Sequence, residues 1–293
     1  MTTSSTSSTP APATLPAGLR LGAVHLTVTD LDRSVRFYEQ ALGLRTQRRG
    51  DREAALGAGA EELVVLAEQR DARPAGRHAG LYHFALLYPS RLELARAAQR
   101  LMASGTPISG ASDHNISEAI YLPDPDGNGL ELAADRPREH WGDLSDPTAL
   151  GGPAPLDLHG LLAPVEGSEP DPEAPDGLVV GHLHLHVGDI ERALAFWRDA
   201  VGFEVMTRFP SAAFIAAGGY HHNLGLNTWR GEGVPPMPDG VVGLRHWTIV
   251  LEDAGQLAAP RERLGRAGFD VEQRPDGFLA RDPWRNAVVF TAP

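Results

Sequence analysis

Two segments of the chain share one pattern of apolar and polar positions over their whole length. Residues 21–44 read LGAVHLTVTDLDRSVRFYEQALGL, and residues 180–203 read VGHLHLHVGDIERALAFWRDAVGF. Each begins with alternating apolar residues, which is the period of a strand with one buried face. Each then passes an aspartate suited to a helix N-cap, Asp30 or Asp189, and continues with apolar residues at helical spacing. The chain therefore uses one strand–helix unit twice.

Two further segments follow the same plan less closely. Residues 81–105 and 244–268 each read as a strand, a loop, a helix and a closing glycine. Short strands and a turn follow them, at residues 121–131 and 279–289. Four βαβββ units are therefore predicted, in an α+β fold of two domains.

Composition marks the expected domain boundaries. Residues 1–18 are mostly Ser, Thr, Ala and Pro without a charged side chain, and we expect a disordered tail there. That segment lacks the basic start and apolar core of a secretory signal. Residues 146–177 are rich in Pro, Gly and acidic residues and are expected to form a linker. The first domain is then 19–145 and the second 178–293.

Charge and cysteine content narrow the chemistry. A formal net charge of −12 argues against nucleic acid or an anionic membrane as a partner. No segment approaches the roughly 18 consecutive apolar residues of a membrane helix. The chain has no cysteine, so a metal would be bound through nitrogen and oxygen atoms. We expect a soluble protein, and a cytoplasmic location agrees with the lack of cysteine. A homo-oligomer is compatible with the sequence.

Several motifs resemble those of the vicinal-oxygen-chelate superfamily, which includes extradiol dioxygenases, glyoxalase I and fosfomycin- and bleomycin-resistance proteins. The strongest is DPDGNGLEL, which ends a predicted strand with a glutamate. Together with others, it makes the chain similar to the two-domain catechol-2,3-dioxygenase-like proteins: GLYHFALL, SEAIYLPDPDGNGLELAADRP, GHLHLHV and GYHHNLGLNTW. The resemblance covers all but the tail and the linker. It implies paired βαβββ units that curl into a cup with metal ligands on the inner wall.

The ligand positions that the resemblance implies can be placed in every unit. In the first strands they fall at Ala23, His83, His182 and His246, and in the last strands of the second and fourth units at Glu131 and Val289. Pairing of units within each domain would leave both sites one ligand short. Pairing across the domains gives one complete set of ligands, His83, Glu131 and His182. The other set, Ala23, His246 and Val289, then lacks ligands. We therefore predict cross-domain pairing and one metal centre.

Two imidazoles and one carboxylate leave coordination positions open, which suits an Fe(II) ion that takes substrate and O2 together. Mn, Ni or Zn are the alternative metals. His25 and His246, by contrast, are expected to be hydrogen-bonded core histidines.

Other polar residues are expected around the metal. His182, His184 and His186 alternate and therefore point to one face of their strand. We expect His184 to take part in catalysis and His186 to steer substrate. Tyr121, ten residues before Glu131, resembles the tyrosine of extradiol dioxygenases that binds the catecholate oxygen, and His114 lies near the position of a second active-site histidine.

The segment GYHHNLGLNTW is expected to face the same cup. A histidine suits a proton donor or acceptor at neutral pH. His222 is the candidate for catalysis, with His221 as the alternative or as a substrate-binding residue, because alternation turns only one of them inward. Asn227 is a candidate for binding substrate.

Three functions are compatible with these residues. The first is an Fe(II)-dependent extradiol dioxygenase that acts on a catechol-type aromatic diol with O2, as in the degradation of aromatic compounds. The second is a glyoxalase-like isomerase or lyase that uses Ni or Zn, with His222 as a fourth ligand. The third is a non-catalytic small-molecule-binding protein, for which a ligand triad would have no use.

Overall fold

The computed structural model describes residues 14–146 and 153–293, and within them the chain folds into four βαβββ units. The first half contains unit 1, with β1 (Arg20–Val28), α1 (Leu31–Gln40), β2 (Arg45–Arg49), β3 (Glu53–Ala58) and β4 (Glu61–Glu68), and unit 2, with β5 (Gly80–Leu87), α2 (Arg91–Ala103), β6 (Gly110–Asp113), β7 (Ser117–Pro123) and β8 (Gly129–Asp135). The second half contains unit 3, with β10 (Val179–His186), α4 (Ile190–Leu194), its continuation η3 (Ala195–Val201), β11 (Glu204–Phe209), β12 (Ala212–Ala216) and β13 (Leu224–Asn227), and unit 4, with β14 (Gly243–Val250), η4 (Ala254–Leu257), α5 (Ala258–Arg266), β15 (Val271–Arg274), β16 (Gly277–Arg281) and β17 (Ala287–Thr291). The predicted α+β architecture is confirmed.

The helices begin where the sequence predicts. Asp30 accepts a hydrogen bond from the backbone N–H of Arg33, and Asp189 accepts one from Arg192. These bonds satisfy amide donors that have no partner inside the helix. The apolar sides of the helices then pack against the sheets, as the fully buried Tyr38 of α1 and Trp197 of η3 illustrate.

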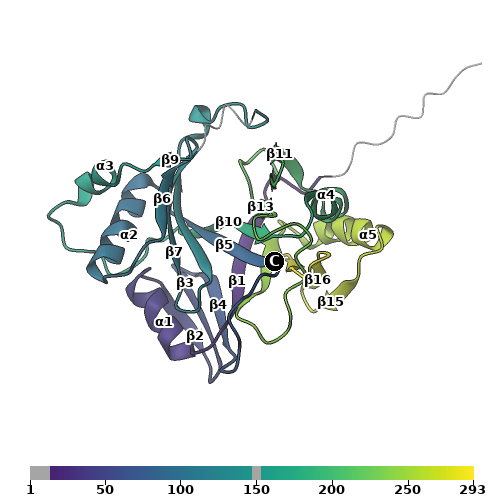
Figure 1. Ribbon diagram of the computed structural model, residues 1–293, viewed down its shortest axis with the longest axis horizontal. Helices are drawn as coiled ribbons and strands as arrows, with labels where there is room; N and C mark the ends of the chain where they lie inside the picture. Colours follow the sequence, from purple (N-terminus) through teal and green to yellow (C-terminus); the bar gives the residue numbers. More distant parts are fainter. Residues whose placement is uncertain (1–13, 147–152) are drawn as a thin grey trace, which may run out of the picture.

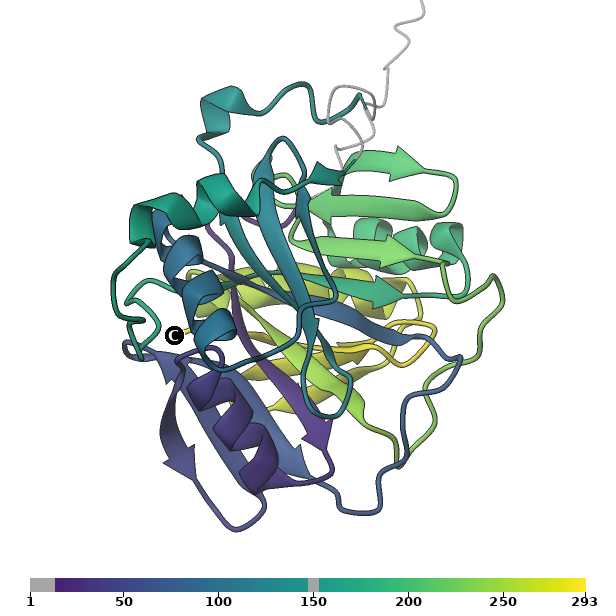
Figure 2. The same ribbon diagram turned by 60° about the vertical axis from the view of Figure 1, so that its left-hand side comes forward.

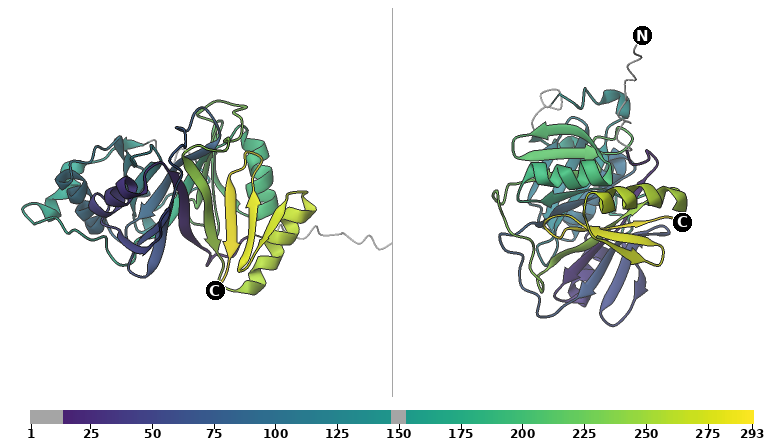
Figure 3. Two further views of the ribbon diagram at one scale, coloured as in Figure 1. Left: turned by 90° about the horizontal axis from the view of Figure 1, so that it is seen from below. Right: turned by 90° about the vertical axis from the view of Figure 1, so that its right-hand side faces the viewer.

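The units pair across the two halves of the chain (Figure 1). Strand β1 runs antiparallel to β14, and β5 runs antiparallel to β10, so unit 1 joins unit 4 and unit 2 joins unit 3. The predicted cross-domain pairing is therefore confirmed. In Figure 3 the strands lie between the helices, with α1 and α2 on one side and α4 and α5 on the other. The inner faces of the two sheets are thus built by both halves together.

The two paired sheets are related by the repeat. Leu21 and Val180, which are equivalent residues of units 1 and 3, lie opposite each other where β1 meets β10. Each long antiparallel ladder is interrupted at the same place. His184 pairs with His83 and Leu185 with Leu81, which leaves Tyr82 as an extra residue; likewise Arg245 is extra between the partners of His25 and Leu26. Such a bulge can turn a side chain to the opposite face of the sheet from the one that strict alternation predicts.

The segment expected to be a linker contains regular structure. It includes β9 (Ala154–Pro155), α3 (Leu158–Leu162) and η2 (Ala163–Val165). Figure 2 shows α3 and η2 beside α2, where Leu161 is buried and Gln99 donates to the carbonyl of Val165. Residues 147–152 lie outside the described part of the chain, as do residues 1–13 of the expected tail. From residue 14 onward the tail is partly packed, because Leu15 is buried and its N–H donates to Gly202.

Within the described residues, no helix is both long and apolar enough to span a membrane.

His25 and His246 face each other across β1 and β14. Their rings are stacked, with centroids 3.9 Å apart and planes 22° apart. Both side chains are partly exposed, so the expectation of hydrogen-bonded core histidines was wrong. The strand pairing brings the two rings together because the residues are direct partners in the ladder.

We predict that the double variant His25→Gln/His246→Gln loses less stability on acidification than the natural chain. Burial and then neighbouring positive groups lower the pKa of His25 from 6.5 to about 4 and that of His246 to about 3. Below pH 6.5 the unfolded chain therefore binds protons that the folded chain does not, so the stability from neutral burial is present above that pH and is lost as the pH falls toward these values. Urea unfolding at about pH 7 and about pH 4.5 measures the difference.

The exposed His140 provides the control, since His140→Gln should leave the pH dependence unchanged. An equal loss of stability in the double variant and the natural chain would contradict the prediction.

Candidate active site

The candidate metal ligands lie on three neighbouring strands. Opposite His182 on β10 stands Ala85 on β5, and beside Ala85 stands Glu131 on β8. Partners in a ladder point to the same face, so the small side chain of Ala85 leaves room for its two neighbours to meet above it. His83 lies two residues earlier on β5 and therefore points to the same face. The row of His182, Ala85 and Glu131, with His83 two residues away on β5, therefore brings the three candidate ligands together.

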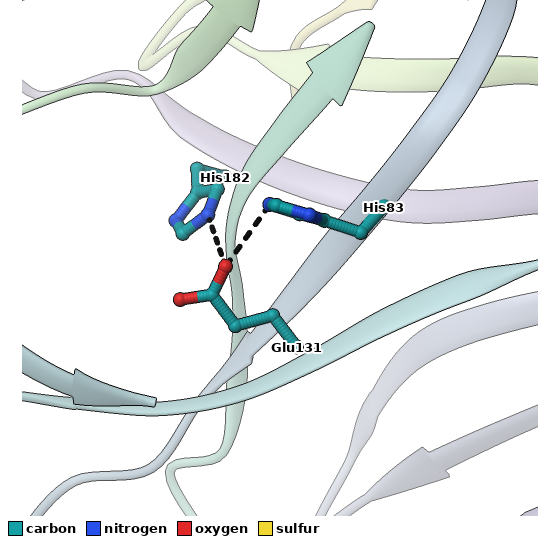
Figure 4. Close-up of side chains that lie close together, drawn as sticks. All are labelled: His83, Glu131 and His182. Atoms are coloured by element: carbon teal, nitrogen blue, oxygen red, sulfur yellow. Dashed lines mark hydrogen bonds and ion pairs between the residues drawn. The ribbon is translucent and has the colours of Figure 1, made fainter. Parts of the chain in front are cut away.

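The three side chains converge on one another (Figure 4). The Nε2 atoms of His83 and His182 lie 3.0 Å and 3.1 Å from the same oxygen, Oε2 of Glu131. The ligand atoms of the three residues all lie within 4.8 Å of one another. Each side chain is at most 8% exposed. The sequence prediction required His182 and Glu131 to lie within reach of one ion, and their separation meets that requirement.

The chemistry of this group fits a divalent metal. His83 Nε2 is buried and makes no hydrogen bond of acceptable geometry, although it lies close to Glu131. With the ring proton on Nδ1, this nitrogen offers its lone pair to a cation. Burial would raise the pKa of Glu131, but the neighbouring His182 and His83 hold that pKa well below its usual range. A buried carboxylate facing two imidazole nitrogens is the donor set of many metal centres with open positions.

Tyr121 and His114 form a hydrogen-bonded pair next to the ligands. Tyr121 lies opposite Glu131 in the ladder of β7 and β8, and its ring centre is 5.6 Å from that of His83. Its hydroxyl is 2.8 Å from Nε2 of His114. Burial and the charge of Glu131 raise the pKa of Tyr121, so its hydroxyl keeps its proton. The structure therefore brings both predicted residues to the site.

His184 faces the same space. Its ring centre lies 5.2 Å from that of His83, and its Nε2 atom is buried without a hydrogen-bond partner among the described residues. Burial, followed by the neighbouring histidines, lowers its pKa well below the usual range, so the ring is neutral. Gly225 opposite it has a specific reason to be glycine, because a Cβ there would lie 2.8 Å from the His184 ring.

His186 and Asn227 bind each other. His186 Nδ1 lies 2.7 Å from Oδ1 of Asn227, and the same oxygen accepts the backbone N–H of Trp229. These two predicted substrate residues thus form a bridge between β10 and β13 at the end of the site. The Asn227 Nδ2 group is buried and has no partner among the described residues.

His222, rather than His221, faces the metal ligands. Its ring centre is 4.1 Å from that of His182 and 5.0 Å from that of Phe214. Burial and then His182 and His221 lower the pKa of His222 well below its usual range. The ring of His221 is farther from His182, at 6.4 Å between centres, and its Nδ1 atom lies 2.8 Å from Nδ1 of His222. Strand alternation does not separate the pair, because residues 220–223 lie outside the strands.

The last residue of β8 and the segment after it hold the loop that carries these histidines. Asp135 accepts hydrogen bonds from the Tyr220 hydroxyl at 2.8 Å and from His221 Nε2 at 3.0 Å. Arg138 donates to the carbonyl of Gly218, and Trp141 packs edge-on against His221. Asp135 is at the end of the strand that supplies Glu131, so one strand positions both a ligand and the neighbouring loop.

Sequence reasoning missed Asp135 and Tyr220, and also the aromatic residues at the site. Tyr82 is 41% exposed and lies edge-on to both His184 and Trp229, which is itself 53% exposed. Strict alternation places Tyr82 on the opposite face from His83, and only the bulge turns it inward. Asp135 carried a weak signal in the sequence, since it lies four residues after the candidate glutamate, on the same face of the strand.

Comparisons with known proteins show which family the chain resembles. The model of the Glyoxalase/Bleomycin resistance protein/Dioxygenase superfamily matches residues 20–132 and again 179–290. A catechol-2,3-dioxygenase of Bacillus subtilis (strain 168) is 38% identical over 274 residues, which cover 92% of this chain and 95% of that protein.

Two solved structures share the fold. One, from Bacillus subtilis and provisionally described as a dioxygenase, has a TM-score of 0.66 at 13% identity and matches 96% of this chain and 86% of its own. Glyoxalase I from Zea mays has a TM-score of 0.59 at 20% identity and matches 94% and 92% of the two chains.

We predict that Asp135→Ala lowers the free energy of unfolding by about 1–3 kcal/mol, because it leaves the Tyr220 hydroxyl and His221 Nε2 without an acceptor. The nitrogen NMR signals of the His222 ring should shift as well, since His221 orients that ring. Asp199→Ala, which removes only an exposed ion pair with Arg198, is the matched control. Unchanged stability together with unchanged His222 signals would show that Asp135 does not hold the loop.

Proposed function

The chain belongs to the Glyoxalase/Bleomycin resistance protein/Dioxygenase superfamily, and we propose that within it the chain is an Fe(II)-dependent extradiol dioxygenase of a catechol-type aromatic diol. Its sequence is 38% identical to that of a catechol-2,3-dioxygenase over 92% of the chain, which makes it a dioxygenase-like oxidoreductase. The observation that carries the finer proposal is the convergence of His83, Glu131 and His182, surrounded by groups that suit a diol.

His83, Glu131 and His182 would hold the metal, with one ligand atom each. Three protein ligands leave positions open for other molecules, as an ion that must engage a diol and O2 requires. When bound, Fe(II) would supply the redox chemistry that lets O2 react with an aromatic ring. The remaining steps depend on the side chains around it.

Tyr121 is placed to hold a diol oxygen. Its hydroxyl keeps its proton, and when the Nε2–H group of His114 donates to the hydroxyl oxygen, that proton is left to be donated to a negative oxygen in a fixed direction. A donor that is aligned before substrate arrives stabilises the anionic diol without reorganisation.

His222 is placed to take a proton from the diol. The low pKa of its buried ring keeps it neutral, and its Nδ1 atom is engaged by His221. The other nitrogen, Nε2, is therefore the one available to accept a proton beside the ligands. Asp135 accepts a hydrogen bond from Nε2 of His221 and so fixes the orientation of that ring. A carboxylate that accepts from one imidazole nitrogen determines which nitrogen carries the proton.

His184 supplies a second neutral imidazole. Its Nε2 atom lacks a hydrogen-bond partner in the described structure, and a buried polar atom without a partner is costly. A polar atom of a bound substrate would satisfy it. We assign His184 a hydrogen bond to an oxygen at the reacting centre.

Aromatic side chains suit a planar substrate. Phe214 lies 5.5 Å from His184 and 5.0 Å from His222 between ring centres. Tyr82 lies edge to face with His184, and Trp229 is tilted against His184 at 5.1 Å. Aromatic rings favour such edge and offset contacts, each contributing about 0.5–1.5 kcal/mol beyond the buried area. An aromatic diol would extend this set of contacts.

The isomerase alternative needs a fourth protein ligand, for which His222 is the nearest histidine to His182. Among the described residues, however, the group of converging ligand atoms has three members. That count favours the dioxygenase, whose reaction needs open positions.

We predict that the chain, reconstituted with Fe(II) without air and then given catechol and O2, forms a yellow ring-cleavage product. His83→Ala, Glu131→Gln and His182→Ala should each lower bound iron and activity by at least about 100-fold, more than the loss of a residue that merely supports a ligand. Iron content and product absorbance measure both effects.

The exposed His159 is the control, and His159→Ala should keep iron and activity. Activity on a hemithioacetal with Ni or Zn, but none on catechol with iron, would favour the isomerase instead.

We predict that His222→Ala lowers kcat by about 10²–10⁴-fold while it leaves bound iron in place, because a positioned acid–base group typically contributes this much. Single-turnover kinetics with measured iron content separate the two effects. An active variant would remove His222 from the acid–base role, and loss of iron would make it a ligand.

A further inference from the structure

The inner face of units 1 and 4 has the same architecture as the candidate metal site but the opposite charge. His25 and His246 occupy the places of His184 and His83, since each pair is opposed in its own ladder. In the candidate metal site Glu131 pairs with Ala85. At the equivalent position of the second face, Val289 pairs with Thr248. The carboxylate that attracts a cation is therefore missing from this face.

An arginine stands where the metal site has a tyrosine. Arg245 is the bulged residue of β14, as Tyr82 is of β5. A bulge turns the extra side chain toward the face that its neighbour occupies. The side chain of Arg245 is exposed, and its positive charge acts on both His25 and His246. Arg245 directly precedes His246 on β14, and the bulge brings its side chain to the face of the stacked rings.

Three further arginines lie on strands of the same sheet. Arg48 pairs with Ala55, Ala55 with Val65 and Val65 with His25, so Arg48 lies in the row of His25. Arg281 pairs with Ala287, which precedes the partner of Trp247, and Arg274 pairs with Gly277 on the same hairpin. The charge of Arg48 lowers the pKa of His25, and those of Arg274 and Arg281 lower the pKa of His246. We call His25, Arg245 and His246, with these three arginines, the arginine face.

Acidic partners offset only part of this charge. Arg48 is 2.8 Å from Glu53 and 3.5 Å from Glu62. Arg274 and Arg281 share Glu272, at 2.9 Å and 3.3 Å. In the described parts of the chain, Arg245 has neither an ion pair nor a side-chain hydrogen bond. It is the arginine of this face that is left to bind something else.

We propose that the arginine face binds the carboxylate of a small organic anion, with Arg245 as its principal contact. A guanidinium group presents two parallel N–H donors that match the two oxygens of a carboxylate. The neutral imidazoles of His25 and His246 add ring N–H donors beside it. This binding is independent of the dioxygenase activity.

The rest of the face suits the carbon skeleton of such a molecule. Ala23 precedes His25 by two residues and so shares its face, and Val289 pairs with Thr248 on the same side. These positions are partly exposed and small or apolar, in a chain whose overall charge is −12. A molecule with one anionic end and an apolar body satisfies both parts of the surface.

Calorimetric titration of the full chain with sodium benzoate tests this proposal. Arg245→Gln should weaken binding at least tenfold, whereas Arg245→Lys, which keeps the charge but not the paired donors, should weaken it less. Arg36→Gln, which removes an exposed arginine of α1, should bind like the natural chain. The ring NMR signals of His25 and His246 should shift on titration.

Two further measurements locate the ligand and identify its chemistry. Benzoate binding that survives Arg245→Gln but is lost in His83→Ala would place the ligand at the metal site and overturn the proposal. Absence of binding in the natural chain would also overturn it. Inorganic phosphate should compete only weakly; phosphate that binds tenfold more tightly than benzoate would overturn the assignment to a carboxylate.

Discussion

Strand β5 comes from the first half of the chain and β10 from the second, and their antiparallel ladder carries the candidate metal site between them. The register of this ladder sets His182 opposite Ala85 and His184 opposite His83. A shift by one residue would turn all four side chains to the other face. Glu131 and Tyr121 extend the row of His182 and Ala85 through β8 and β7, so this one pairing sets the positions of the ligands and of Tyr121.

The pairing of β5 with β10 affects stability because it places two histidines around a buried carboxylate. Isolated in an apolar setting, Glu131 would be strongly destabilising, and it is tolerated because two imidazoles from different halves of the chain face it. The same strand then continues to Asp135, which holds the loop of His221 and His222. Binding of a metal would therefore link the two halves, and ligands that bind only the folded chain stabilise it.

The internal repeat predicted the units of the fold, and the ligand positions implied by the family resemblance predicted their pairing, since ligands missing at Ala23 and Val289 left one combination complete. Contacts that depend on departures from regular strands could not be predicted. Tyr82 and Arg245 reach their inner faces through bulges, which alternation cannot anticipate. Asp135 and Trp141 act on a loop some 80 residues away in sequence, and no local pattern reports such a contact. The stacking of His25 on His246 likewise follows from the register alone.

The two inner faces show one scaffold adapted to opposite charges, with a glutamate and histidines on one side and arginine with histidines on the other. We propose that a single metal is held by ligands from both halves of the chain. Anomalous diffraction at the iron edge, from crystals of the Fe(II)-loaded chain, tests it most directly. We expect one peak in bonding contact with His83, Glu131 and His182. A peak elsewhere, or one whose ligands all come from one half of the chain, would contradict it.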